Sequence, residues 1–159
     1  LGIARCFSFV GPFLPLDIHY AIGNFIAQAL HAERIVVNSD GTALRSYLYA
    51  ADLVVWLLAL LLDGKSGQSC NVGSDAAISI GDLAHLVREL IAPDKAVDIL
   101  GKAASAVGNP IRNAYIPDIT MARNTLGLDV WTDLSTAIRS TARHAANQMT
   151  DDDSKEGQQ

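Results

Sequence analysis

The chain has 159 residues, half of them apolar, with a charged fraction of 18% and a formal net charge of −5. This length allows one domain with a sizeable core. The acidic balance argues against nucleic acid or an anionic membrane as the main partner, because both attract basic proteins. A small anionic ligand is compatible with it, because such a ligand needs only a few well-placed arginines.

Two cysteines, Cys6 and Cys70, lie in separate apolar runs. They offer too few ligands for a zinc site and are typical of reduced, buried thiols, so we expect a cytoplasmic protein. The N-terminus lacks a signal-peptide pattern. The longest apolar run, Leu53–Leu62, is too short to span a bilayer and predicts a core helix.

The first elements follow from hydrophobic periodicity. Leu1–Val10 is apolar at nearly every position, which predicts a strand buried in a parallel sheet. A Gly-Pro pair ends this strand. Apolar residues at helical spacing predict an amphipathic helix over Asp17–Ala32. Arg34–Val37 then predicts a short strand, and Asn38–Gly41 a turn.

The next stretch presents one arginine on a rigid element. A strand is predicted over Leu44–Tyr49 and an apolar helix over Ala50–Leu62. Arg45 lies at the start of the strand, just after the turn. A guanidinium pairs two oxygens at once, so we interpret Arg45 as the phosphate ligand of a nucleotide-type molecule. The alternative is a surface arginine paired with a carboxylate.

The second half continues the alternation of strands and helices. Ser69–Gly73 predicts a strand, and Ser79 begins a helix with Asp82 as its capping-box partner. Another strand is predicted over Val97–Leu100, and the small residues of Gly101–Asn113 predict a loop.

The last elements are helical. Asp118 is predicted to cap a short helix that ends at Gly127, and an alanine-rich helix is predicted over Leu134–Gln148. Strands separated by helices indicate an α/β fold. The chain supplies too few strands to bury Leu1–Val10, so we expect that part of the fold is missing.

Five segments together resemble the extended short-chain dehydrogenase/reductases, which are NAD-dependent nucleotide-sugar epimerases and 4,6-dehydratases. Their order and spacing carry the resemblance, which extends from Leu1 to His144. The segments are R-C-F-S-F-V-G-P at Arg5–Pro12, N-F-I-A-Q-A-L-H-A-E-R-I-V-V at Asn24–Val37, S-D-G-T-A-L-R-S-Y-L-Y-A-A-D-L at Ser39–Leu53, C-N-V-G at Cys70–Gly73 with I-S-I-G-D-L-A at Ile78–Ala84, and Y-I-P-D-I-T-M-A-R-N-T-L-G-L at Tyr115–Leu128.

The resemblance covers only the C-terminal, substrate-binding half of that family. It implies a small mixed α/β substrate-binding domain over residues 1–149, plus the last strands of an incomplete Rossmann-like sheet. A disordered acidic tail is predicted over residues 150–159. The G-x-x-G-x-x-G turn that holds NAD and the Y-x-x-x-K pair are absent from the sequence. We therefore expect the chain alone to bind no cofactor and to be inactive, with NAD bound in the complete family enzyme.

Site residues are carried over from the family's motifs by position. The family's phosphate-gripping arginine falls on Arg45, and a second arginine that lines the diphosphate falls on Arg112. Ser8 stands where the family has a substrate-contacting asparagine, and Val10 stands where it has a tyrosine. These two departures change the sugar contacts that the family motif implies.

Other polar residues have a functional and a structural interpretation. Asn24 is interpreted as a ligand contact, with a plain polar surface residue as the alternative. His19 and Tyr20 both lie near the expected substrate entrance, and the alternative for His19 is a solvated or structural side chain. Asp52 is interpreted as stabilising the N-terminus of its helix through the macrodipole.

Two functions follow as hypotheses. The first is the nucleotide-sugar-binding part of an NAD-dependent epimerase or 4,6-dehydratase, with nucleotide sugar as the partner and neither nucleic acid nor membrane. The second is a non-catalytic assembly module, because the strand over Leu1–Val10 and the apolar helices leave surface uncovered. In either case we expect a homodimer.

Overall fold

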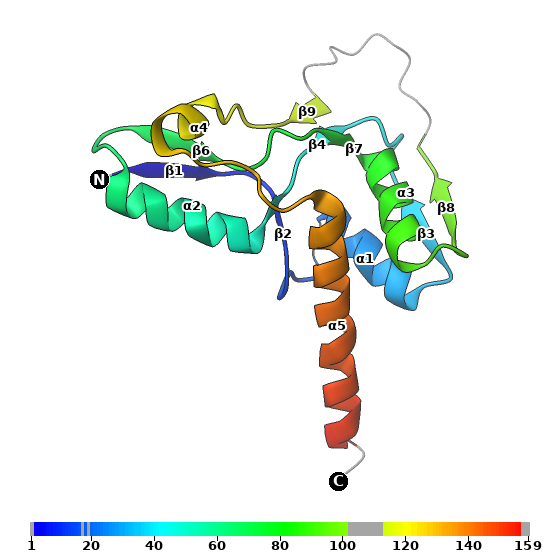
Figure 1. The fold of residues 1–159 in the computed structure, drawn as a ribbon. Coiled ribbons are helices and arrows are strands. Elements are labelled where there is room, and N and C mark those ends of the chain that lie inside the picture. The colour runs from blue at the N-terminus through cyan, green and yellow to red at the C-terminus, as the bar shows by residue number, and fades with distance from the viewer. Residues whose placement is uncertain (1, 17, 19, 102–112, 157–159) are drawn as a thin grey trace.

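The computed structural model describes residues 2–16, 18, 20–101 and 113–156, with side chains described up to residue 148 (Figure 1). Strands and helices alternate along most of the chain. In order they are β1 (Ile3–Cys6), β2 (Phe9–Val10), α1 (Ala21–His31), β3 (Arg34–Val37), β4 (Leu44–Arg45), β5 (Leu48–Tyr49), α2 (Ala50–Asp63), β6 (Ser69–Val72), β7 (Ile78–Ser79), α3 (Ile80–Ile91), β8 (Ala96–Ile99), β9 (Ala114–Tyr115), α4 (Thr120–Leu126) and α5 (Leu134–Glu156).

The strands pair mainly in parallel. β1 pairs with β6, β2 with β5 and β3 with β8, each as a parallel two-stranded sheet. A small mixed sheet places β4 between β7, which is antiparallel to it, and β9, which is parallel. Parallel strands connected through helices confirm the predicted α/β class.

The larger core lies where α1, α3 and α5 pack together beside β3 (Figure 1). Each helix contributes the apolar face that its periodicity creates, and the opposite faces carry polar residues. The largest fully buried side chains of this core are those of Val10, Ile22, Ile26, Ile35, Val37, Leu83, Val87 and Ile138.

A second core lies at the other end of the molecule. Figure 1 shows α4 and α2 on opposite sides of the β1–β6 pair. Trp56 of α2 is fully buried there, and its Nε1 donates a hydrogen bond to the Asp129 carbonyl at 2.9 Å. The buried members of this core are Leu48, Trp56, Cys70, Val72, Ile119, Ala122 and Leu128.

Two predicted strands are broken in the structure. The strand expected over Leu1–Val10 divides into β1 and β2, and the one expected over Leu44–Tyr49 divides into β4 and β5. Each half pairs with a different neighbour, because the chain crosses from one sheet to another between them. β1 is exposed along its whole length, which agrees with the expectation that this chain supplies too few strands to bury an apolar strand of this kind.

Helix boundaries also differ from the prediction. α1 begins at Ala21, not at Asp17, because Tyr20 is extended with φ −96° and ψ 122°. α5 continues to Glu156, beyond the boundary at residue 149 that we expected from composition. Extending a formed helix costs little compared with starting one, so the polar residues prolong the alanine-rich segment. Residues 157–159 lie outside the described part.

Several local predictions are confirmed. The Ser79 hydroxyl accepts from the Asp82 N–H at 3.0 Å and donates to the Asp82 carboxylate at 2.6 Å, which caps α3. Gly127 ends α4 with φ +63°, and Gly41 forms its turn with φ +74°. Asp118 instead precedes the N-cap, and its carboxylate accepts from the Thr120 N–H at 2.9 Å.

Within the described residues, no helix combines the length and apolar character needed to cross a bilayer. Most of the loop predicted over Gly101–Asn113 lies outside the described residues.

Candidate functional site

A cavity of about 500 Å³ opens at the carboxyl ends of β1 and β3. Phe7 and Ser8 follow directly on β1, and Ser39 comes shortly after β3. Ligands of open α/β sheets bind at this edge of the strands, and the volume falls in the usual range for ligand sites. The lining residues are Phe7, Ser8, Phe9, Leu14, Tyr20, Ala21, Ile22, Ser39, Ala43, Arg45, Tyr47 and Ile80.

Arg45 is the cation in the described wall of this cavity. It lies in β4, with Ile78 of β7 and Tyr115 of β9 as its neighbours in the sheet. Its Nη1 donates to the Leu44 carbonyl at 2.7 Å and to the Asn113 carbonyl at 2.9 Å. These contacts fix the guanidinium in place without neutralising its charge.

Arg45 forms no ion pair with any carboxylate in the part of the chain that the structure describes. The other interpretation, a surface arginine paired with a carboxylate, therefore does not describe its surroundings. Arg123 is an arginine of that kind, because it pairs with both Asp75 and Asp129 at the surface. A half-buried arginine held by carbonyls retains its capacity to attract an anion.

Tyr47 supplies a neutral hydroxyl to the same wall. Burial raises the pKa of its phenol to about 12, although the Arg45 charge opposes this shift. The phenol therefore remains protonated at physiological pH and can donate a hydrogen bond. Ser8, Ser39 and Tyr20 add further hydroxyls. One cation, several hydroxyls and an apolar remainder suit an anionic ligand that also carries hydroxyl groups.

An aromatic contact joins the two sides of the site. The rings of Phe7, after β1, and Tyr115, in β9, lie with their centroids 4.7 Å apart at an interplanar angle of 32°. Tyr115 is also the strand partner of Arg45. This contact connects the end of β1 to the sheet that carries the arginine, which limits their relative movement.

The structure brings together two of the five residues that the sequence predicted for the site. Arg45 and Ser8 both line the cavity. Asn24 lies outside the lining of the cavity. With its amide oriented so that the NH₂ group faces the loop before α1, Asn24 donates to the Ile18 carbonyl at 2.9 Å and to the Leu16 carbonyl at 3.2 Å. His19 and Arg112 lie outside the described residues.

Sequence reasoning missed Tyr47 and Ser39. Tyr47 follows Arg45 by two residues, and side chains two apart in an extended segment share one face. The two-residue spacing from Arg45 was therefore the feature of the sequence that indicated Tyr47 as a further site residue. Ser39 comes after the third strand, at the edge where ligands of α/β sheets bind.

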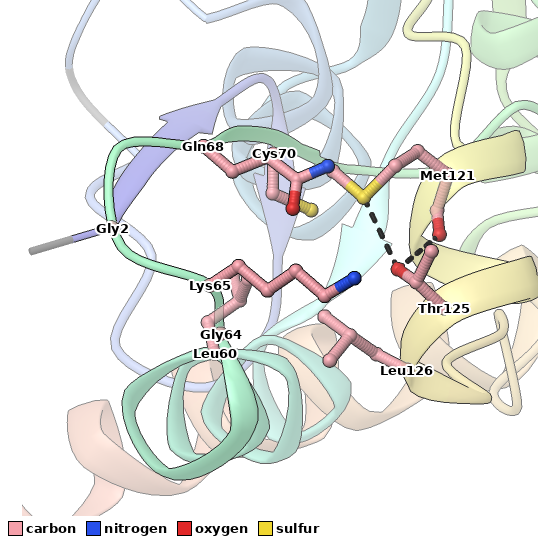
Figure 2. Close-up of a pocket in the computed structure, with 9 residues that line it drawn as sticks. All are labelled: Gly2, Leu60, Gly64, Lys65, Gln68, Cys70, Met121, Thr125 and Leu126. Atoms are coloured by element: carbon pink, nitrogen blue, oxygen red, sulfur yellow. Dashed lines mark hydrogen bonds between the residues drawn. The ribbon is translucent and has the colours of Figure 1, made fainter.

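A second, much smaller cavity of about 40 Å³ lies at the amino ends of β1 and β6 (Figure 2). Figure 2 shows the Lys65 side chain extending toward Thr125 and Leu126. The Thr125 hydroxyl donates to the Met121 carbonyl at 2.7 Å, and burial raises the pKa of the Cys70 thiol. This space is too small for a nucleotide. Nor do the described residues include a cluster of side chains able to hold a metal ion.

Sequence comparison relates the chain to a known family and to curated relatives. Residues 2–73 match the model of the NAD dependent epimerase/dehydratase family. The chain is 34% identical over 127 residues to UDP-glucuronic acid decarboxylase 6 of Arabidopsis thaliana, which covers 80% of this chain and 35% of that protein. It is 29% identical over 147 residues to UDP-glucuronic acid decarboxylase 1 of Xenopus tropicalis. The chain thus spans about a third of the length of these curated relatives.

Solved structures share the fold. UDP-glucose 4-epimerase of Thermotoga maritima superposes with a TM-score of 0.79 at 20% identity, covering 93% of this chain and 46% of that one. UDP-glucuronic acid 4-epimerase of Bacillus cereus superposes with a TM-score of 0.75 at 24% identity, covering 92% of this chain and 45% of the other. At these identities the likeness establishes the fold alone.

Proposed function

We propose that this chain, which belongs to the NAD-dependent epimerase/dehydratase family, binds the diphosphate of a UDP-sugar in the cavity around Arg45. The observation that carries the proposal is a half-buried guanidinium held by two backbone carbonyls and free of any described carboxylate. The choice of a UDP-sugar is supported by the names of the relatives, in which UDP-glucuronic acid recurs.

Each part of the cavity has a role in this proposal. The Arg45 charge attracts the diphosphate, because charge-assisted hydrogen bonds to phosphate oxygens are strong. The neutral Tyr47 phenol and the Ser8 hydroxyl donate to sugar or ribose oxygens. The apolar side chains of Phe9 and Leu14 accommodate the less polar part of the ligand. The chain thereby binds and orients a nucleotide sugar.

The residues of this chain do not fit a dinucleotide site of their own. A Gly-rich turn after a first strand would be needed to cradle the pyrophosphate. Gly11 is not part of such a cradle, because a Cβ built on it would lie 2.5 Å from the Ala50 Cβ, where the chain packs closely on α2. We therefore propose that this chain supplies no dinucleotide site and does not by itself turn over a nucleotide sugar.

Thermal unfolding with added nucleotides tests the binding proposal. UDP or UDP-glucuronic acid at about 100 times its dissociation constant should stabilise the chain by roughly 2.7 kcal/mol. Arg45→Ala should abolish this stabilisation, and Arg45→Lys should retain part of it, because lysine keeps the charge but loses the paired donors. Arg34→Ala is the matched control, because Arg34 is an exposed arginine paired with Asp98 at 2.8 Å on β3 and β8.

Two results would overturn the proposal. One is a folded sample whose melting temperature no nucleotide changes. The other is a stabilisation that persists undiminished in Arg45→Ala. Comparing UDP with ADP and GDP in the same assay measures whether the base is selected. Turnover of a nucleotide sugar by the purified chain would contradict the statement that it is inactive alone.

A further inference from the structure

A further cavity, of about 380 Å³, lies between the loop that follows β2 and the middle of α5. Figure 1 shows β2 next to α5, and the two elements are in contact. The volume falls in the usual range for small-molecule sites. The loop contributes Phe13, Leu14, Pro15 and Leu16 to the lining, and α5 contributes Thr141, His144, Ala145 and Gln148.

The lining of this cavity is apolar with a few neutral polar groups. The four α5 residues are spaced by three and four positions, so they lie on one face of the helix. The Thr141 hydroxyl is already used, because it donates to the Ala137 carbonyl at 2.8 Å. None of the described lining residues is an arginine, a lysine or a carboxylate. A ligand of this cavity is therefore expected to be uncharged and largely apolar.

His144 carries a buried nitrogen that lacks a hydrogen bond. Its Nε2 is closed to solvent and has no partner among the described residues. Buried polar atoms are nearly always hydrogen-bonded, because an unsatisfied one has lost its contacts with water without replacing them. A nitrogen of a neutral imidazole accepts or donates according to the tautomer, whereas a hydroxyl group can do both. A hydroxyl therefore satisfies Nε2 in either tautomer.

Phe13 lies against this imidazole in an unusual backbone conformation. The two rings have their centroids 4.2 Å apart at an interplanar angle of 58°. The φ of Phe13 is +66°, which bulky residues rarely adopt, and Phe13 is 77% exposed to solvent. Strained residues of this kind occur at ligand clamps, where the strain is retained because the conformation is used. The exposed ring has solvent beside it into which it can turn.

We propose that this cavity binds a small uncharged aromatic alcohol of the phenol class, which places its ring between the loop and α5 and its hydroxyl on His144 Nε2. The Phe13 ring turns away from the imidazole to admit the ligand. An aromatic body fits because the aliphatic side chains of Leu14 and Leu16 and the two aromatic rings offer it apolar contact. The hydroxyl fits because it gives the buried nitrogen its missing partner.

This site adjoins the cavity around Arg45 but takes a different ligand. Leu14 lines both cavities. A phenol carries no charge for Arg45 to attract, and a diphosphate meets no cation among the described residues that line the second space. The inference therefore does not rest on nucleotide binding by Arg45, and either proposal can fail alone.

An NMR titration of the chain with phenol tests the inference, with toluene as the matched ligand that lacks the hydroxyl. Phenol is expected to shift the backbone amides of Thr141 and Ala145 and the ¹⁵N resonance of His144 Nε2 in a saturable way, and to bind at least tenfold more tightly than toluene. Absence of saturable shifts at these residues overturns the proposal. Shifts at Ser8 and Tyr47 in their place also overturn it, because the phenol would then occupy the other cavity.

Two variants with a control make the result specific. His144→Phe keeps a ring against Phe13 but removes Nε2, so phenol should lose its tenfold preference over toluene. Ala145→Phe fills the cavity and should abolish binding of both ligands. Ala146→Phe, the same substitution one position along α5 and outside the lining, should leave both affinities unchanged.

The alanine pair decides the location of the site even where His144→Phe does not fold. A preference for phenol that persists in a folded His144→Phe variant would contradict the role of Nε2. Binding that survives Ala145→Phe, or that Ala146→Phe reduces equally, would contradict the assignment of the cavity.

Discussion

Helices α3 and α2 show how differently the two ends of the molecule are built. α3 buries Leu83, Ala84 and Val87 on one face and exposes His85 and Glu89 on the other. α2 buries one apolar face and exposes another. One apolar face and one polar face, as in α3, are typical of a helix at the surface of a protein. Apolar residues on all sides, as in α2, are typical of a buried helix. Among the described residues, the end with α3 therefore buries the apolar face of its helix, whereas the end with α2 leaves one apolar face exposed.

The largest difference between the two ends is expected in the free energy of unfolding when one leucine at each end is shortened to alanine. Leu83→Ala should cost about 2–5 kcal/mol of unfolding free energy, because Leu83 is fully buried and its removal leaves a cavity. Leu58→Ala on the exposed face of α2 should change it by no more than about 0.5 kcal/mol. Urea denaturation of both variants measures the difference. Equal losses would show that the α2 face is already covered in solution.

A smaller effect is expected where the two ends are joined. Asp52, buried in the first turn of α2, accepts from the N–H groups of Trp131 and Thr132 at 3.2 and 2.9 Å and from the Thr132 hydroxyl at 3.1 Å. Asp52→Ala leaves these donors without an acceptor, so we expect a loss of about 1–3 kcal/mol in urea denaturation. Asp63→Ala, at the exposed end of the same helix, is the control and should be nearly neutral.

The smallest effect concerns acid stability at the start of α5. The Thr136 hydroxyl and N–H donate to the Asp133 carboxylate at 2.7 and 2.9 Å and lower the pKa of Asp133. A lowered pKa in the folded state adds stability above the unfolded value near 3.9, and this stability is lost as the pH falls through the folded value. Asp133→Asn should flatten that acid slope slightly, as measured by denaturation between pH 5 and about 2.

Thr136→Ala should weaken the acid slope in the same direction, because it removes the hydroxyl that contributes most to the shift. An unchanged slope in both variants would mean that this carboxylate titrates alike in the folded and unfolded chain.

Local chemistry was predictable from the sequence, and long-range pairing was not. The cap formed by Ser79 and Asp82 needs residues only three apart, so its pattern was sufficient. The contact from Arg45 to the Asn113 carbonyl joins residues 68 apart, which no local pattern indicates. The break between β1 and β2 was missed because hydrophobic runs do not say which strand will be the partner.

In the candidate site, too, some residues were predictable from sequence motifs, whereas others depended on contacts that only the structure shows. Arg45 was predicted from its place in the strand and from the family motif, and Ser8 from the motif alone, and both line one cavity. Asn24 was predicted as a ligand contact, but its amide lies against the carbonyls of Leu16 and Ile18 in the loop before α1. The sequence does not indicate whether an asparagine amide donates hydrogen bonds to a loop backbone or to a ligand, so only the geometry separates the two interpretations.

The central claim is that the cavity at the carboxyl ends of β1 and β3 binds a nucleotide diphosphate, and a backbone-amide NMR titration with UDP tests it most directly. We predict saturable shifts at Ser8, Ser39, Arg45 and Tyr47, with Gln68 and Cys70 at the opposite edge unchanged. Shifts confined to that opposite edge, or equal shifts in Arg45→Ala, would contradict the account.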